Sequence, residues 1–302
     1  MRVNKKVKVI GLILILSIFT TGCLPKIGGR KKNRSNDIQL KAEHKDNAES
    51  HYELGSVAGY NNQFDLAEKE LKKAIKINPN YTDAYNNLGL VYASQDKWKQ
   101  AEMVFRKAIE IDPGYAEAYY NMAILNIKSN KQDEGLEMLE MTLKIQPEHK
   151  RAMFDIARIY EAQGKLGDAI TNYLKLTEID NKNAYVFYRL GWAYFQRGLI
   201  DASYEAFKKS IEISPEQSEP YYKLGVVLQN AGRIDESISM YKKSLELLNK
   251  NFEAFMNLGD IYLYEKQDKR EALYNYRKAL ELNPDSKAAA QMLDEVLKQM
   301  SR

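Results

Sequence analysis

The sequence predicts an all-α protein built from helical hairpins that repeat along the chain. Prolines recur at a spacing of 34 residues, and small residues recur in register with them. Within each period the apolar residues lie three and four positions apart, which is the spacing of an amphipathic helix. The 302 residues include only 16 Gly and 7 Pro, a composition that excludes collagen-like and disordered chains.

The first predicted element is an N-terminal signal peptide, residues 1–22. Four basic residues lie between Arg2 and Lys8, and a fourteen-residue apolar run, 9–22, follows them. A stable transmembrane helix needs about 20 apolar residues, so this run fits the core of a signal peptide better than a permanent anchor.

The apolar run ends at Thr20-Thr21-Gly22-Cys23, which resembles the lipobox of bacterial lipoproteins. In that family a small residue precedes a Cys that is lipidated and becomes the new N-terminus. The residue three positions before the Cys is usually Leu, and here it is Thr20. The resemblance implies an anchor of several acyl chains at Cys23. The alternative is an ordinary buried thiol at the end of a signal sequence.

The lipobox resemblance implies a location in the bacterial cell envelope. In a cell with two membranes we expect the outer membrane, facing the periplasm, because Leu24 rather than Asp follows the Cys. In a cell with one membrane we expect the outer face of the cytoplasmic membrane.

Residues 23–47 are predicted to be a flexible tether that begins at the lipidated Cys. Leu24-Pro25 and Gly28-Gly29 interrupt regular structure, and no apolar periodicity appears before about Ala48. The basic run from Arg30 to Arg34 suits either contact with anionic head groups or a solvated linker.

Seven units and a final helix follow the tether. In each unit a Leu, Met or Ile precedes a small residue, and another small residue follows twelve positions later, or thirteen in the last unit, which carries one inserted residue. Small side chains at both positions let two helices approach closely. A large residue recurs where the helices would meet: Leu71, Phe105, Leu139, Tyr173, Phe207, Tyr241 and Tyr276. The residue types that end the first helix in six units tolerate a left-handed backbone: Asn62, Asp96, Asn130, Gly164, Gly198 and Gly232.

These columns resemble the tetratricopeptide repeat (TPR), whose pattern is Trp-x2-Leu-Gly-x2-Tyr…Ala-x3-Phe…Ala…Pro. The second unit matches it nearly throughout, from Tyr85 and Leu88-Gly89 to Pro113. The resemblance implies a right-handed α-solenoid of seven TPR hairpins over 48–286, closed by a capping helix over 287–302. The predicted units are 48–81, 82–115, 116–149, 150–183, 184–217, 218–251 and 252–286.

The family's geometry implies that the first helices line a concave groove that binds a protein or peptide. Acidic residues flank a basic and aromatic middle in this groove, and Arg, Trp and Tyr are enriched at binding hot spots. An apolar patch of Leu90, Tyr120, Ile124 and Ile127 suits either a docked helix or packing on the next repeat. The candidate partner-binding residues are Tyr120, Ile124, Arg151, Phe154, Arg158, Tyr188, Arg189, Trp192, Phe195, Tyr222 and Lys223.

The leading functional hypothesis is a lipid-anchored scaffold for an envelope complex of the secretion, pilus or cell-wall machinery. Its architecture resembles that of pilotins and of adaptors that recruit peptidoglycan hydrolases. The alternative is a glycan-binding lipoprotein in which Tyr188, Trp192 and Phe195 stack on cell-wall saccharide.

Several other classes of function lack support in the sequence. We expect no enzyme, because there is no phosphate loop and no nucleophile with a nearby base. One Cys excludes a cysteine-built zinc site, the three scattered His do not predict a metal centre, and no cofactor motif is present. Beyond position 47 the chain has 34 basic and 38 acidic residues, so it lacks the basic footprint of a nucleic-acid-binding domain.

Overall fold

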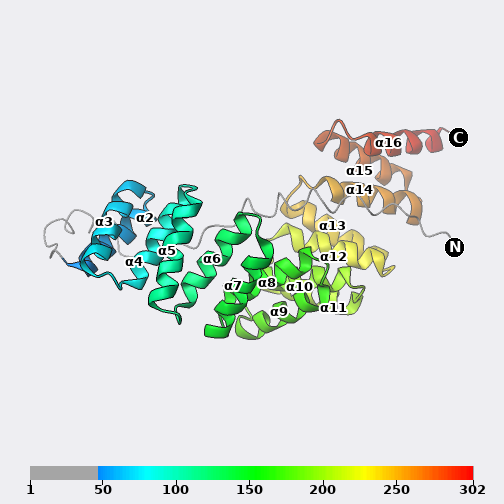
Figure 1. The fold of residues 1–302 in the computed structure, drawn as a ribbon. Coiled ribbons are helices and arrows are strands. Elements are labelled where there is room, and N and C mark those ends of the chain that lie inside the picture. The colour runs from blue at the N-terminus through cyan, green and yellow to red at the C-terminus, as the bar shows by residue number, and fades with distance from the viewer. Residues whose placement is uncertain (1–46, 302) are drawn as a thin grey trace. The chain divides into compact units, whose positions relative to one another are not determined.

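The computed structural model describes residues 47–301, and every regular element in that range is helical (Figure 1). The predicted signal peptide, the predicted lipidation site Cys23 and nearly all of the predicted tether lie outside the described residues. None of the described helices has the length and apolar character needed to cross a bilayer. The helices are α2 (Ala48–Tyr60), α3 (Phe64–Ile77), α4 (Thr82–Ser94), α5 (Trp98–Ile111), α6 (Ala116–Lys128), α7 (Gln132–Ile145), α8 (Lys150–Ala162), α9 (Leu166–Ile179), α10 (Ala184–Gln196), α11 (Ile200–Ile213), α12 (Ser218–Asn230), α13 (Ile234–Leu247), α14 (Phe252–Asp260), the π-helix η3 (Ile261–Glu265), α15 (Lys269–Leu282) and α16 (Lys287–Met300).

The described chain divides into two compact units, and the division lies within α8 between Ile156 and Ala157. In the first unit α2 packs on α3, α4 on α5 and α6 on α7. In the second unit α10 packs on α11, α12 on α13 and α14 on α15, and α16 packs on α15. The first helices of neighbouring pairs also touch, as α2 and α4 do, and α10 and α12. The predicted all-α array of hairpins is therefore confirmed.

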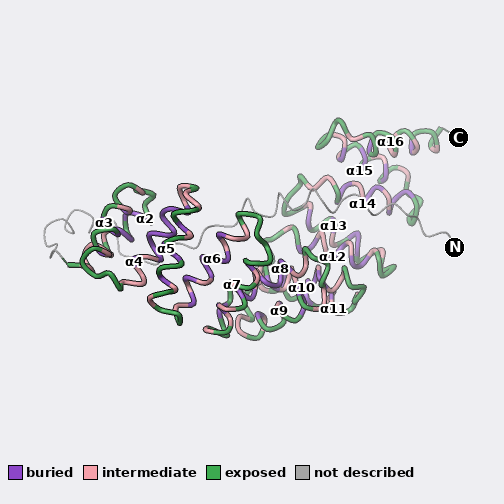
Figure 2. Tube along the Cα trace, in the orientation of Figure 1, coloured by how far each residue is buried: buried purple, intermediate pink, exposed green. Residues whose placement is uncertain are grey.

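Glycines allow the two helices of a hairpin to approach closely. A Cβ atom added to Gly89 would lie 2.4 Å from the ring of Phe105, and one added to Gly225 would lie 2.7 Å from the ring of Tyr241. Phe105 and Tyr241 are fully buried. Buried positions recur along the helices of both units (Figure 2). The recurring small and large residues of the sequence therefore meet across the hairpins, and an extra methyl group would force one of these rings to move.

Serine hydroxyls make part of the same contact. In the second unit Ser203 and Ser237 occupy the position that holds Ala in several other repeats, and both are fully buried. Each hydroxyl donates a 2.8 Å hydrogen bond to a backbone carbonyl of the partner helix, at Gly191 and Gly225 respectively. Because the hydroxyls are hydrogen-bonded, serine is tolerated in the interior there.

A residue with positive φ ends the first helix of each hairpin. The six residues predicted for this role have φ values between 57° and 79°. The seventh is Gln267, with φ of 54°, which the sequence pattern did not identify. Gln267 is neither Gly, Asn nor Asp, so the last repeat carries backbone strain that the other repeats avoid.

The inserted residue of the last repeat is accommodated by a π-helical turn. Helix α14 continues into η3, where the backbone N–H of Lys266 donates to the carbonyl of Ile261 across 3.0 Å, five residues earlier. A π-turn absorbs one extra residue without breaking the helix. The turn keeps Tyr262 and Leu263 buried and leaves Tyr264 exposed.

Candidate functional site

The predicted groove residues fall into two groups, one in each compact unit. The first unit holds Tyr120, Ile124, Arg151 and Phe154. The second unit holds Arg158, Tyr188, Arg189, Trp192, Phe195, Tyr222 and Lys223.

In the first unit, Tyr120 and Arg151 take part in contacts within the protein. Tyr120 is buried, and its hydroxyl donates to the Asp155 carboxylate across 3.0 Å. The Arg151 guanidinium lies over the Tyr120 ring at 4.7 Å and donates to both oxygens of Glu117, at 2.9 and 2.8 Å. Phe154 is partly exposed. These contacts leave little of Tyr120 for a partner to touch.

His149 completes this cluster, although the sequence did not indicate it. Its Nδ1 accepts the backbone N–H of Ala152 across 3.1 Å at the start of α8. Its Nε2 lies 3.4 Å from Glu117, and its ring is 4.9 Å from that of Tyr120. The hydrogen bond from His149, together with the charge of Arg151, lowers the pKa of Glu117.

The apolar patch predicted in the first unit is partly buried. Leu90 is buried, and Ile124 is partly exposed. The void between these side chains and their neighbours has a volume of about 10 Å³, which is room for a single water at most. Leu90 and Ile124 are therefore closely packed against their neighbours.

Three asparagines on the first helices of the first unit, Asn86, Asn87 and Asn121, are also buried. Asn87 donates to the Ser56 hydroxyl across 2.9 Å, and Asn121 donates to the side-chain oxygen of Asn86 across 2.7 Å. These amide donors are therefore engaged with other side chains of the same unit.

In the second unit Arg189 is held by a partly buried ion pair. Its guanidinium donates to the Glu161 carboxylate across 2.7 Å, and Tyr173 donates to the same carboxylate across 2.9 Å. Burial raises the pKa of Tyr173, so its hydroxyl stays protonated and remains a donor at neutral pH. Arg158 is half-buried, and its positive charge acts on Tyr173.

The aromatic residues of α10 form a row that is partly open to solvent. Tyr188, Trp192 and Phe195 lie three and four residues apart on this helix, and all three are partly exposed. The rings of Trp192 and Phe195 stack with centroids 5.3 Å apart. The Lys223 ammonium of α12 lies 4.3 Å from the Trp192 ring and 5.1 Å from that of Tyr222. We call Tyr188, Trp192 and Phe195 the α10 row.

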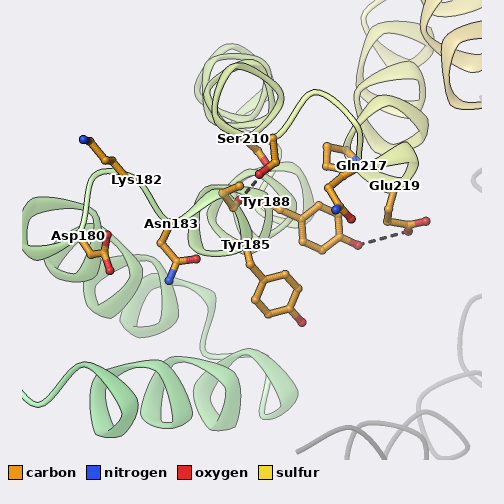
Figure 3. A pocket seen from close by; sticks show the side chains of 11 residues that line it. Asp180, Lys182, Asn183, Tyr185, Tyr188, Ser210, Gln217 and Glu219 are labelled. Atoms are coloured by element: carbon orange, nitrogen blue, oxygen red, sulfur yellow. Dashed lines mark hydrogen bonds between the residues drawn. The ribbon is translucent and has the colours of Figure 1, made fainter. Parts of the chain in front are cut away.

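A cavity of about 700 Å³ lies beside the first turn of α10 (Figure 3). The α9–α10 and α11–α12 connections contribute to its wall, together with the starts of α10 and α12. The Tyr185 and Tyr188 rings stack with centroids 5.8 Å apart and planes inclined by 17°. The Tyr188 hydroxyl points toward the Glu219 carboxylate and donates to it across 3.3 Å. The side chains with polar groups at this wall include Asp180, Lys182, Asn183, Ser214, Gln217 and Glu219.

The cavity lies where an aromatic ring stands in the first unit. In the first and third repeats the last residue of the repeat is a ring that packs on the aromatic of the first helix: Tyr81 lies 4.9 Å from Tyr52, and His149 lies 4.9 Å from Tyr120. The equivalent of Tyr81 in the fifth repeat is Gln217, beside Tyr188. The shorter amide side chain leaves the space open.

This column of last residues could have revealed the cavity from the sequence. It reads Tyr81, Tyr115, His149, Asn183, Gln217 and Asn251, so it changes from aromatic to amide at the fourth repeat. The predicted groove residues all lie on the first helices, whereas Asn183 and Gln217 lie in the connections between repeats. Among the described residues no group of three or more His, Cys, Asp or Glu could hold a metal ion.

Family models of the tetratricopeptide repeat match most of the described chain. A model described as TPR repeat matches 60–96, 157–198 and 191–232. Models described as tetratricopeptide repeat match 82–115, 104–137 and 216–285. With the hairpin geometry, these matches show that the chain belongs to the tetratricopeptide repeat family. TPR proteins are generally non-catalytic scaffolds that bind proteins or peptides.

Solved TPR structures share the fold at low sequence identity. The C-terminal part of a TPR repeat-containing protein from Cytophaga hutchinsonii has a TM-score of 0.69 and 17% identity, over 80% of this chain and 99% of that chain. The protein pilF of Pseudomonas aeruginosa has a TM-score of 0.57 and 20% identity, over 72% and 97%. YrrB, described as a TPR protein with an unusual peptide-binding site, has a TM-score of 0.57 and 19% identity, over 63% and 98%. No curated protein matches the sequence significantly.

Proposed function

We propose that this protein is a lipid-anchored, extracytoplasmic scaffold that binds a peptide segment of a partner on its second unit. The observation that carries the proposal is the α10 row beside a cavity of about 700 Å³. Ligand sites are commonly clefts of roughly 300–1,000 Å³ lined by aromatic side chains and a few polar groups. YrrB, which shares the fold, is described as having a peptide-binding site.

The row has the composition of a binding surface. Tyr and Trp offer large contact areas and lose little conformational entropy on binding. Trp192 is partly exposed and lies under the Lys223 ammonium, so a ligand can contact the exposed part of the ring and a charge together. Membership of a family of binding scaffolds supports the same conclusion.

A peptide fits this surface better than a saccharide. A sugar ring stacks on an open aromatic face, and the α10 row offers few of these. The Tyr188 ring packs on Tyr185 and meets the edge of Phe207 at 5.8 Å, while Trp192 is in contact with Phe195 and Lys223. An extended peptide needs only pockets and polar groups along a ridge.

The anchor is proposed from the Cys23 lipobox resemblance. Acyl chains at this residue would hold the repeats at the membrane surface of the bacterial envelope, where the scaffold would act in assembling a secretion, pilus or cell-wall complex. The test is mass spectrometry of the chain purified from its own cells. We expect an N-terminal Cys23 bearing acyl chains, and membrane release of Cys23→Ser. A mature chain that begins elsewhere and lacks acyl groups would overturn this part of the proposal.

Peptide binding can be followed through one fluorophore. The chain has two tryptophans, and both carry a lysine over the ring, Lys128 at 6.0 Å from Trp98 and Lys223 at 4.3 Å from Trp192. Trp98→Phe therefore leaves Trp192 as the only reporter, and Trp192→Phe is the matched control. The ligands are peptides selected from a random phage-displayed library on the full-length chain in detergent.

Titration with these peptides should change the emission of the Trp98→Phe protein in a saturable way and leave that of Trp192→Phe unchanged. Muropeptides serve as the second ligand. A saturable response to muropeptides alone would replace the peptide proposal with glycan binding. If neither ligand changes the Trp192 emission, the second unit is not the binding surface.

A further inference from the structure

We propose that the cavity beside α10 takes a basic side chain, Lys or Arg, of the bound peptide. This inference rests on the proposed function, because it assigns a recognition pocket within the same binding surface. It follows from the shape, the charges and the aromatic faces of the cavity.

The shape follows from the replacement of a ring by an amide. Tyr81 and His149 fill the corresponding space in the first and third repeats, and Gln217 leaves it open beside Tyr188. The resulting volume, about 700 Å³, exceeds that of one side chain, so it admits a long side chain with part of its main chain.

The charges favour a cation. Asp180 and Glu219 are acidic, and Lys182 is the basic residue of the wall. The Glu219 side chain is 53% exposed, and its partners are Lys223 Nζ at 3.7 Å and the Tyr188 hydroxyl at 3.3 Å, both longer than a charge-assisted hydrogen bond. The Glu219 carboxylate therefore keeps room for a closer ion pair with a ligand.

The helix N-termini at the cavity do not compete for an anion. The Asn183 side-chain oxygen accepts the backbone N–H of Val186 across 3.3 Å and caps α10. Glu219 lies in the first turn of α12, where its charge complements the helix dipole. The N-termini of α10 and α12 thus already interact with Asn183 and Glu219 of the protein itself.

The aromatic faces add attraction for a cation. Tyr185 is exposed, and it stacks on Tyr188 in a nearly parallel arrangement. The Arg189 guanidinium lies 6.0 Å from the centroid of the Tyr185 ring, at the outer limit of cation–π attraction. Tyrosine faces stabilise Lys and Arg through cation–π attraction. The Asn183 and Gln217 amides can hydrogen-bond the peptide main chain beside that side chain.

The test begins with the peptides selected on the full-length chain in detergent. We expect Lys or Arg to be enriched at one position. Replacing that residue by norleucine should weaken binding to the wild type about tenfold. Glu219→Gln should weaken the binding of the basic peptide by a similar factor and leave the affinity for the norleucine peptide unchanged. Glu212→Gln is the matched control, because Glu212 is 51% exposed and lies in the same unit.

A second variant tests the space itself. Gln217→Tyr restores the ring that Tyr81 provides in the first repeat, and should occupy the part of the cavity beside the Tyr188 ring without disturbing the helices. We expect it to abolish the preference for a basic residue. The helical circular dichroism should stay unchanged.

The outcomes separate this inference from the proposed function. If the binding of the selected peptides depends on Trp192 but no position is enriched in Lys or Arg, the inference is overturned and the proposed peptide site is retained. The same holds if Glu219→Gln does not change the affinity. Failure to select any peptide, or binding that is indifferent to Trp192, overturns both.

Discussion

The Arg189 guanidinium donates to the Glu161 carboxylate across 2.7 Å, and the two side chains are 17% and 10% exposed. Glu161 lies in the last turn of α8, and Arg189 lies in α10. The contact therefore joins the first helices of the fourth and fifth repeats within the second unit. Arg189 stabilises the repeat stack, so its loss would affect folding as well as any binding.

We expect Arg189→Ala to destabilise the protein by about 3 kcal/mol, because it leaves a partly buried carboxylate without its cation. Urea unfolding followed by circular dichroism measures the change. Arg151→Ala is the control, since Arg151 and Glu117 are 46% and 39% exposed and such a pair contributes at most about 1 kcal/mol. Equal losses of stability in the two variants would contradict the conclusion that the Arg189–Glu161 ion pair stabilises the repeat stack.

A methyl group at Gly225 should destabilise the sixth hairpin. The added Cβ would lie 2.7 Å from the buried Tyr241 ring, and overpacking of this kind costs about 1–3 kcal/mol. Gly167→Ala is the matched substitution in α9, where the nearest side-chain atom would be 3.7 Å away. There the higher helix propensity of Ala should raise the stability by about 0.5 kcal/mol. A higher thermal unfolding midpoint for Gly225→Ala would contradict the claim that this glycine is needed for the close approach of the two helices.

Gln267→Gly should stabilise the last repeat. Gln267 has φ of 54°, a conformation that costs a non-glycine residue about 1 kcal/mol. Glycine removes most of that cost, so the unfolding midpoint should rise. The converse variant Gly232→Ala, at φ of 72°, should lower it. A lower unfolding midpoint for Gln267→Gly would show that the Gln267 side chain adds more stability than its strained backbone conformation costs.

The Glu117 cluster predicts an acid-sensitive contribution to stability. The hydrogen bond from His149 and the charge of Arg151 hold the pKa of Glu117 below its ordinary value of 4.5. A carboxyl with a lowered folded pKa stabilises the fold above its unfolded pKa, and this contribution is lost as the pH falls through the folded pKa. Glu117→Gln should therefore lose less stability than the wild type as the pH falls below about 4.5.

A charge control accompanies the Glu117 measurement. Glu110→Gln removes one negative charge at a side chain that is 64% exposed. Its unfolding free energy should follow that of the wild type as the pH falls. If Glu117→Gln also follows the wild type, the cluster does not contribute to acid sensitivity.

The sequence was sufficient to predict the hairpins, because their determinants lie at fixed spacing in one chain. The close contacts of Gly89 with Phe105 and of Gly225 with Tyr241 follow from columns sixteen residues apart. The period also revealed one extra residue in the last repeat. The period did not show that the first helix accommodates this residue by a π-turn. The position of the turn depends on the burial of Tyr262 and Leu263, which the period does not reveal.

The binding surface was less predictable than the fold. Repeat position identified the α10 row, but it could not show that Arg189 is engaged by Glu161, because that partner lies 28 residues away on another helix. The cavity was missed for a related reason. It depends on the absence of a ring at Gln217, and it becomes evident only when neighbouring repeats are compared side by side.

Site-specific photocrosslinking in the native cells tests the central claim most directly, namely that a partner binds beside α10. A benzophenone amino acid replaces Tyr185 in one strain and Tyr274 in another, since the two residues are 54% and 55% exposed and Tyr274 lies on α15. We expect a protein adduct from position 185 that a peptide selected on the purified chain competes away, and none from position 274. An adduct from position 274 alone, or one at 185 that the peptide leaves untouched, would contradict the claim.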